Sequence, residues 1–295
     1  MRPSRAVLLT ASASAALVLA LVLRWSSSGD TASRIADKPI SITPGPAGLV
    51  SGTAPTQSGT VWLLASTLKG ANLQRVRIRS GRVLGIVPLP KEASVLAESA
   101  GGYLGVGVSP ASAGAVEFLS STGGAAIGTV PVSGRVLDLV AGVDGTTFYA
   151  ATQSRGSRVL DVISIPAQKV MSHVPLPAHT VSVAVTADQT TLFALESNGS
   201  ISVIDIGTSR VTDRFPAGPD ARHIAITPDG SRLLVLKGAL NSNNVSVLDI
   251  TKQSTISVLP APANTRWIVA TSDSAQVVNF VGTTTMGNVQ AFLLP

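Results

Sequence analysis

The sequence predicts an all-β fold built from six similar units, and three observations lead to this prediction. A proline, preceded in most cases by an apolar residue, recurs at intervals of 44, 43, 44, 41 and 44 residues. Each interval holds about four short apolar segments separated by turn residues, which is typical of short strands joined by tight connections. Apolar residues make up 45% of the chain and charged residues only 13%, as expected for many buried strands.

The repeat is clearest in the unit that begins at Pro216. There His223–Thr227 is followed by the turn Pro228–Gly230, a second apolar segment at Arg232–Lys237 and a third at Asn244–Ile250. Four short strands in each unit, repeated around a circle, are the arrangement of a β-propeller. We therefore predict a six-bladed β-propeller over residues 38–295. Its blades are marked by Pro44, Pro88, Pro131, Pro175, Pro216 and Pro260.

The two ends of the repeat predict how the ring closes. The chain after Pro260 has room for three strands, at Trp267–Thr271, Gln276–Phe280 and Asn288–Leu293. The segment Pro39–Thr43, which lies before the first proline mark, supplies a fourth. We expect this N-terminal strand to pair into the last blade, because that pairing removes an exposed sheet edge. An open solenoid is the alternative, and it needs capping units at its ends.

The N-terminal segment has the pattern of a membrane-spanning or signal helix. Arg2 and Arg5 precede an uncharged run, Ala6–Leu23, which as a helix is roughly 27 Å long at about 1.5 Å per residue. This length is close to the hydrocarbon thickness of a bilayer, about 30 Å. We predict a signal anchor or signal peptide over residues 1–25 and a flexible linker over residues 26–37.

The same segment predicts where the propeller is located. The apolar run ends without a small-x-small cleavage site, which favours an uncleaved anchor over a cleaved signal peptide. Positive charge before an apolar segment keeps that end in the cytoplasm. We therefore expect a single-pass protein of the cell membrane with its propeller outside the cytoplasm, or a secreted protein if the leader is cleaved.

Residues 175–260 resemble a known propeller repeat. Ile224–Ile250 and Val183–Ile206 each run from an apolar strand through an Asp-containing turn into a second apolar strand, and then into a strand that ends in Asp-Ile. In this they are similar to the YVTN-type repeat of bacterial and archaeal propellers, which is itself WD40-like. The resemblance implies a bacterial or archaeal propeller. Its members include surface-layer-associated proteins, lactonase-like enzymes and subunits of redox enzymes, so it implies no single activity.

The residues with chemically active side chains predict neither a catalytic centre nor a cofactor. The chain has no cysteine, and its three histidines lack the spacing of metal ligands. There is no G-x-S-x-G elbow and no phosphate-binding glycine loop. A net charge of +6, without a stripe of basic and aromatic residues, predicts no nucleic-acid partner. The recurrent aspartates are expected to fix turns; they are Asp188, Asp205, Asp229 and Asp249.

In five of the six blades, basic or titratable residues stand where the first strand begins, so we expect them at one mouth of the central channel. The candidate ligand-binding residues are Arg135, His179, Arg222, His223 and Arg266. Such a ring in a low-dielectric funnel would attract anions. The alternative is that these are ordinary solvated loop residues, some of them paired with Glu92, Asp138 or Asp220.

These observations favour a non-catalytic, extracytoplasmic binding or scaffold propeller that presents its loops and a weakly basic channel mouth to a protein partner or an anionic ligand. One alternative is a lactonase-like hydrolase, which requires Glu92, Asp138, His179 and His223 to converge in the channel. Another is an accessory subunit of an exported redox enzyme.

Overall fold

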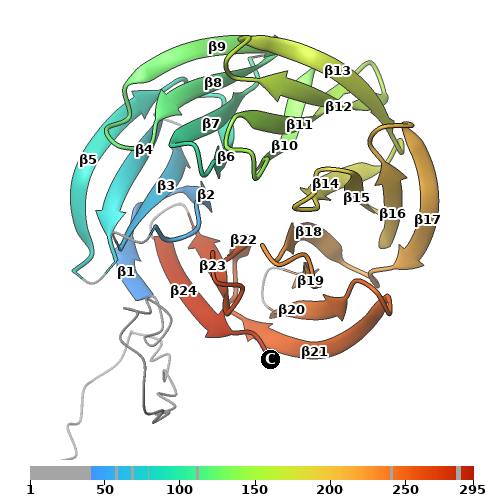
Figure 1. Ribbon diagram of the computed structural model, residues 1–295. Helices are drawn as coiled ribbons and strands as arrows, with labels where there is room; N and C mark the ends of the chain where they lie inside the picture. The colour runs from blue at the N-terminus through green and yellow to red at the C-terminus, as the bar shows by residue number, and fades with distance from the viewer. Residues whose placement is uncertain are drawn as a thin grey trace, which may run out of the picture. The chain divides into compact units, whose positions relative to one another are not determined.

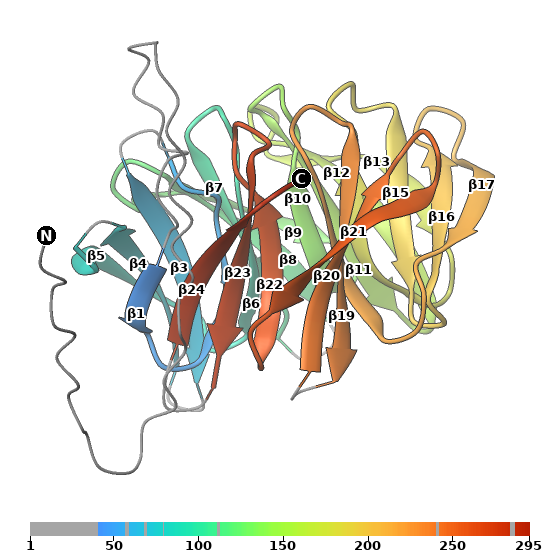
Figure 2. The same cartoon turned by 90° about the horizontal axis from the view of Figure 1, so that it is seen from below.

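The computed structural model describes residues 41–56, 59–67, 70–78, 80–110, 113–239, 242–283 and 287–295. Within these residues the chain forms 24 strands, grouped in six four-stranded antiparallel sheets. The sheets follow one another around a common axis, each with one strand beside the axis and one at the periphery (Figure 1). The protein is therefore an all-β, six-bladed propeller. Figure 2 shows the same blades from the side, with their strands running between the two faces of the ring.

The first three blades are consecutive along the chain, and in each the strand order from the axis outward is the sequence order. The first blade contains β2 (Leu49–Gly52), β3 (Thr60–Thr67), β4 (Gly70–Arg77) and β5 (Arg82–Leu89). The second contains β6 (Ala93–Glu98), β7 (Tyr103–Val108), β8 (Gly114–Ser120) and β9 (Ala126–Val132). The third contains β10 (Arg135–Ala141), β11 (Thr147–Ser154), β12 (Ser157–Ser164) and β13 (Lys169–Leu176).

The fourth and fifth blades repeat this order. The fourth contains β14 (Thr180–Val185), β15 (Thr191–Glu196), β16 (Ser200–Asp205) and β17 (Arg210–Pro216). The fifth contains β18 (Ala221–Ile226), β19 (Arg232–Ala239), β20 (Ser242–Asp249) and β21 (Ser254–Ala261). The prolines that mark the repeat in the sequence lie in the outermost strands. Proline has no backbone N–H to donate, and an outermost strand needs none on the side that faces solvent.

The sixth blade combines strands from both ends of the described chain. It contains β22 (Thr265–Ala270), β23 (Gln276–Gly282), β24 (Gly287–Leu293) and, outermost, β1 (Ser41–Gly45). Strand β1 pairs antiparallel with β24, with Ser41 opposite Gln290. The strand expected at Pro39–Thr43 is thus described from Ser41 onward and extends to Gly45, while residues 39 and 40 lie outside the described part.

The predicted membrane or signal helix at Ala6–Leu23 and the linker at residues 26–37 also lie outside the described residues. Within the part that the structure describes, no helix has the length and apolar character needed to cross a membrane.

The hydrophobic core lies between neighbouring blades. Phe193 and Leu195 of the fourth blade, for example, share one cluster with Ile224 and Val235 of the fifth. Alternate side chains of a strand point to opposite faces, so each sheet packs against the blade before it and the blade after it. This packing holds the innermost strands in place around the channel.

The turns confirm the expectation for the recurrent aspartates. Asp229 Oδ1 accepts hydrogen bonds from the Ser231 amide at 3.1 Å and from the Thr227 hydroxyl at 2.5 Å. Asp188 and Asp205 accept similar bonds from residues two or three positions later. These carboxylates are therefore committed to local backbone structure.

Candidate functional site: the central channel and its mouths

The six innermost strands line the channel, and all six contain a bulge at the same place. In each strand one residue has no partner in the neighbouring strand, which is the signature of a β-bulge. The unpaired residues are Val50, Ser94, Leu137, Val181, Arg222 and Arg266. The residue after each bulge occupies an equivalent position around the axis. We call this set the inner ring: Ser51, Val95, Asp138, Ser182, His223 and Trp267.

A chain of hydrogen bonds connects two members of the inner ring, Asp138 and Ser182, with their neighbouring blades. Asp138 Oδ2 accepts the Ser182 hydroxyl at 2.6 Å and the Val183 amide at 2.8 Å. The Ser182 oxygen in turn accepts the Ile224 amide at 3.1 Å. Side chains of the third and fourth blades thus accept hydrogen bonds from backbone N–H groups of the innermost strands of the fourth and fifth blades, which have no further strand on the channel side.

Asp138 is a carboxyl group inside the wall of the channel. Its side chain is buried, and Oδ1 accepts the Leu139 amide at 2.8 Å. Burial raises the pKa of Asp138 to about 7, although the hydrogen bonds from Ser182, Val183 and Leu139 oppose this rise. Near neutral pH the group therefore exists in both the protonated and the ionised form.

His223 and Trp267 form an aromatic pair at the same level of the channel. Their ring centroids are 3.9 Å apart, with the planes inclined by 43°. His223 is buried, and both this burial and the neighbouring Arg222 lower its pKa, to about 3, so the imidazole is neutral at physiological pH. Trp267 packs against core clusters of the first and sixth blades and of the second and third, so its indole extends across the channel.

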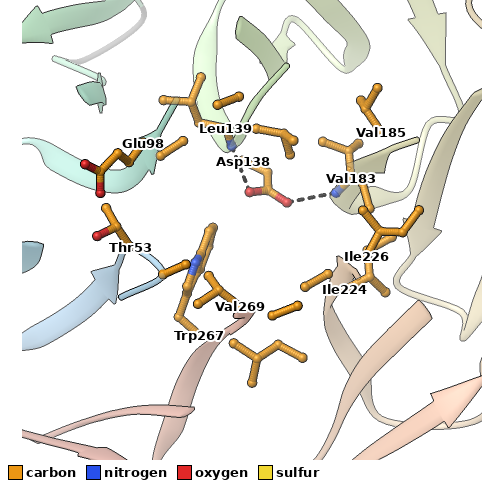
Figure 3. Close-up of a pocket in the computed structure, with 18 of the residues that line it drawn as sticks. Thr53, Glu98, Asp138, Leu139, Val183, Val185, Ile224, Ile226, Trp267 and Val269 are labelled. Carbon is orange, nitrogen blue, oxygen red and sulfur yellow. Dashed lines mark hydrogen bonds between the residues drawn. The ribbon is translucent and has the colours of Figure 1, made fainter. Parts of the chain in front are cut away.

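A cavity of about 250 Å³ lies along the carboxyl-terminal halves of the innermost strands. Asp138, His223 and Trp267 belong to its lining, and its other walls are mainly Val, Ile, Leu and Ala side chains. Figure 3 shows Trp267 reaching from β22 toward Asp138, with Glu98 beside Thr53 at the edge of the opening. Burial raises the pKa of Glu98, while side-chain hydrogen bonds from Thr53 and Ser121 and the charge of Arg75 oppose this. We call this space the channel cavity.

The amino-terminal ends of the innermost strands form the opposite mouth of the channel, and three cations lie there. Arg222 donates from Nη2 to Asn243 Oδ1 at 2.6 Å and to the Thr265 carbonyl at 3.1 Å, so it reaches from the fifth blade to the sixth. Arg266 donates from Nε to the Gly282 carbonyl at 2.9 Å. Lys237 pairs with Ala221, next to Arg222. We call Arg222, Lys237 and Arg266 the basic mouth.

The cations of the basic mouth lie close enough to affect one another. Burial lowers the pKa of Arg222, and the positive charge of Arg266 lowers it further. Burial also lowers the pKa of Lys237. Within the described residues, none of these three cations has a carboxylate partner at ion-pair distance. The mouth therefore gathers three cations, and no carboxylate of the described part of the chain lies within ion-pair distance of them.

The five candidate residues from the sequence occupy three different kinds of position. Arg222 and Arg266 are bulge residues, and His223 belongs to the inner ring. Arg135 and His179 each lie one position before the residue that precedes the bulge, and both are exposed. The structure therefore brings Arg222 and Arg266 together, places His223 in the wall of the channel cavity, and leaves Arg135 and His179 at the surface.

The four residues of the hydrolase alternative are separated in the same way. Asp138 and His223 line the channel cavity, but Glu92 and His179 are exposed and do not. No group of three histidine, cysteine or carboxylate residues within the described part is arranged to hold a metal ion.

Two residues near the channel were missed in the sequence. Glu98 occupies a position at which the other blades have Ala54, Ala141, Val185, Ile226 and Ala270. An alignment of the six units would have shown it as the one charged member of an apolar column. Lys237 lies on the second strand of its blade, and only the strand pairing places it beside the basic mouth.

A serine, a histidine and an aspartate also meet away from the channel, in the third blade. The Ser133 hydroxyl donates to Asp161 Oδ1 at 2.6 Å, and His173 Nδ1 lies 2.6 Å from the same oxygen. In a catalytic triad the serine bonds the imidazole nitrogen that faces away from the carboxylate. Here Ser133 lies 3.4 Å from Nδ1 itself, so the cluster fastens the connection between β9 and β10 rather than activating a nucleophile.

Comparisons with known proteins support the fold and nothing more specific. No protein-family model matches the sequence, and no curated protein is similar to it. Among solved structures, a chain of hydrazine synthase from Kuenenia stuttgartiensis matches with a TM-score of 0.61 and 18% sequence identity, covering 79% of this chain and 73% of that chain. At this identity the likeness shows a shared architecture alone. The chain is thus a six-bladed β-propeller, and its resemblance to the YVTN-type repeat stays a prediction.

Proposed function

We propose that the protein is a non-catalytic binding propeller, held at the outer face of a cell membrane by its N-terminal segment, that binds an acidic group of a partner through the basic mouth. The observation that carries this proposal is the pair Arg222 and Arg266, which lie close together with no carboxylate partner in the described part of the chain. Neighbouring cations without a counter-ion are unfavourable in isolation and favourable when an anion binds between them.

The geometry of Arg222 supports the same role. Its guanidinium is held by Asn243 and the Thr265 carbonyl, while its Nε atom is buried with no partner in the described residues. A guanidinium that is already oriented loses little conformational freedom when it binds a carboxylate or phosphate. The membrane location rests on Ala6–Leu23 and its flanking arginines.

The test uses a fluorescein-labelled hexaglutamate peptide and the full-length chain at low salt, with fluorescence anisotropy as the readout. Substituting both Arg222→Ala and Arg266→Ala is expected to weaken binding at least tenfold, and added salt should weaken binding to the wild type. Arg82→Ala, which removes an exposed cation from the outer strand β5, is the matched control and should have little effect. Equal losses in the control and in the double variant would contradict the proposal.

An accessory subunit of an exported redox enzyme is a second candidate. Its support is the fold likeness to a chain of hydrazine synthase, which at 18% identity extends no further than the fold. Isolation of the full-length protein from membranes of its own cells tests it, because an accessory subunit should co-purify in constant ratio with a cofactor-containing chain.

A further inference from the structure

We propose that the channel cavity is a second binding site, which takes a small organic amine with an apolar body. This site is separate from the basic mouth: the lining of the cavity includes none of Arg222, Lys237 and Arg266. The proposal does not depend on the basic mouth binding anything.

The size and walls of the cavity define the body of the ligand. At about 250 Å³ it is smaller than the pockets of drug-sized ligands, which span about 300–1,000 Å³. Its walls are built from side chains such as Leu139, Val183 and Ile224, which offer no hydrogen bonds. A compact apolar group would displace poorly bound water from these walls.

The polar groups of the cavity define the head of the ligand. The lining contains the carboxyl groups Asp138 and Glu98, the indole of Trp267 and the neutral imidazole of His223, and it contains no lysine or arginine among the described residues. Arg75 is the one cation whose charge acts on Glu98, and it does not line the cavity. Carboxylates beside an aromatic ring are the surroundings that stabilise an ammonium group.

Asp138 has an acceptor site left for such a head. A carboxylate offers about four lone-pair sites. Three are taken, by the Ser182 hydroxyl and by the Val183 and Leu139 amides, of which only the last bonds Oδ1. A donor from the cavity side can therefore bond Oδ1 without displacing a protein group. A cation there would also compensate the cost of a buried carboxylate that has no ion-pair partner in the described structure.

His223 gives an independent indication that a polar group in the cavity wall awaits a bound partner. Its side chain is 94% buried in the cavity wall, since its exposed fraction is 6%, and its Nδ1 atom has no hydrogen-bond partner within the described residues. The ring of Trp267 lies against the imidazole, with the two ring centroids 3.9 Å apart. Buried polar atoms are rarely left unpaired in a stable fold, and a bound molecule is one of the common reasons.

Three size-matched probes test the proposal by titration calorimetry on the full-length chain at pH 8. They are 2-phenylethylamine, which is cationic, 2-phenylethanol, which is neutral, and phenylacetate, which is anionic. The amine is expected to bind at least tenfold tighter than the alcohol. In the double variant Arg222→Ala, Arg266→Ala, whose basic mouth no longer attracts anions, phenylacetate should bind weakest because carboxylates line the cavity. Equal affinities for amine and alcohol, or no binding of the amine, would overturn the proposal.

Variants locate the site and separate it from the basic mouth. Asp138→Asn should weaken amine binding about tenfold and leave the alcohol unaffected, and Glu98→Gln should have a smaller effect in the same direction. Arg82→Ala, which lies outside both sites, should leave amine affinity unchanged. The hexaglutamate peptide tests the basic mouth separately, so failure of the cavity and failure of the basic mouth are distinguishable. An Asp138→Asn variant that folds, by circular dichroism, and binds the amine as well as the wild type would contradict the proposal.

The pH dependence gives a further readout. The titratable groups that share the cavity with Asp138 are Glu98 from β6 and His223 from β18. A primary amine stays protonated up to pH 8, so amine affinity should rise between pH 6 and pH 8 as Asp138 ionises. The rise should be absent in Asp138→Asn. An affinity that falls with pH in the wild type would overturn the proposal.

Discussion

The Asp138 carboxylate accepts the hydroxyl of Ser182 across a blade boundary, at 2.6 Å and 44 residues apart along the chain. Because both residues belong to the inner ring, this bond joins the innermost strands of the third and fourth blades. The buried, titratable side chains at this level give the protein a specific dependence of stability on pH.

Asp138→Asn is expected to change that dependence. The pKa of Asp138 is raised from 3.8 to about 7 in the folded protein, so its contribution to stability is full below pH 4 and is lost as the pH rises to about 7. The slope is at most about 1.4 kcal/mol per pH unit. In Asp138→Asn this loss is absent. The opposing contribution of His223 then remains, so the free energy of unfolding should rise from pH 4 to pH 6.5. Urea denaturation at half-unit intervals of pH measures it.

His223→Phe is expected to give the opposite slope. The pKa of His223 is lowered from 6.5 to about 3, so the unfolded chain binds more protons between these values and stability rises with pH there. In the wild type, Asp138 and His223 change the free energy of unfolding with pH in opposite directions, so their two contributions nearly cancel between about pH 4 and pH 6.5. Phenylalanine keeps a ring against Trp267 but does not titrate, so the free energy of unfolding should fall over this range. The double variant lacks both contributions, so its slope should lie between those of the two single variants; a slope outside them would refute the paired explanation.

Gly145 and Gly230 occupy equivalent turns in the third and fifth blades, with φ of 76° and 71°. A Cβ at position 145 would lie 2.7 Å from the Gly101 amide nitrogen of the second blade, whereas at position 230 it meets nothing within 4 Å. Both Gly→Ala changes carry the backbone penalty of about 1–2 kcal/mol. Gly145→Ala should lose about 1–3 kcal/mol more, through overpacking between blades. Equal denaturation midpoints for the two variants would show that the contact is easily relieved.

Removal of strand β1 is expected to destabilise the ring. We propose that its pairing with β24 closes the propeller, since without it the outer edge of the sixth blade is unpaired. A chain of residues 46–295 should melt several degrees below a chain of residues 38–295, at about 2–4 °C per kcal/mol lost. A synthetic peptide of residues 38–46 should restore part of the difference. Identical melting curves for the two chains would show that closure contributes nothing.

The strands could be predicted from the sequence because each depends on local patterning. Arg232–Lys237 was expected and β19 spans Arg232–Ala239, and Gln276–Phe280 was expected where β23 spans Gln276–Gly282. Hydrophobic alternation and turn residues are enough to place such strands, with errors of about two residues at their ends.

The site could be predicted only in part, because its contacts connect different repeats. The hydrogen bond from Arg222 to the Thr265 carbonyl and the ring contact between His223 and Trp267 join the fifth blade to the sixth. Such contacts depend on the bulges, which shift the register by one residue and separate Arg222 from His223. Charge and repeat position together predicted one ring of cations. In the structure the bulge distributes the candidate residues between the basic mouth, the wall of the channel cavity and the exposed surface.

The bulge residue of each innermost strand can affect ligand binding without being part of the strand pairing. It forms no rung of the ladder, so it has no cross-strand partner in its sheet. Ser94, which is exposed, is the position where a new side chain disturbs packing least. A cation introduced there should extend the positive surface of the mouth toward the second blade, so that ligand preference becomes adjustable one blade at a time.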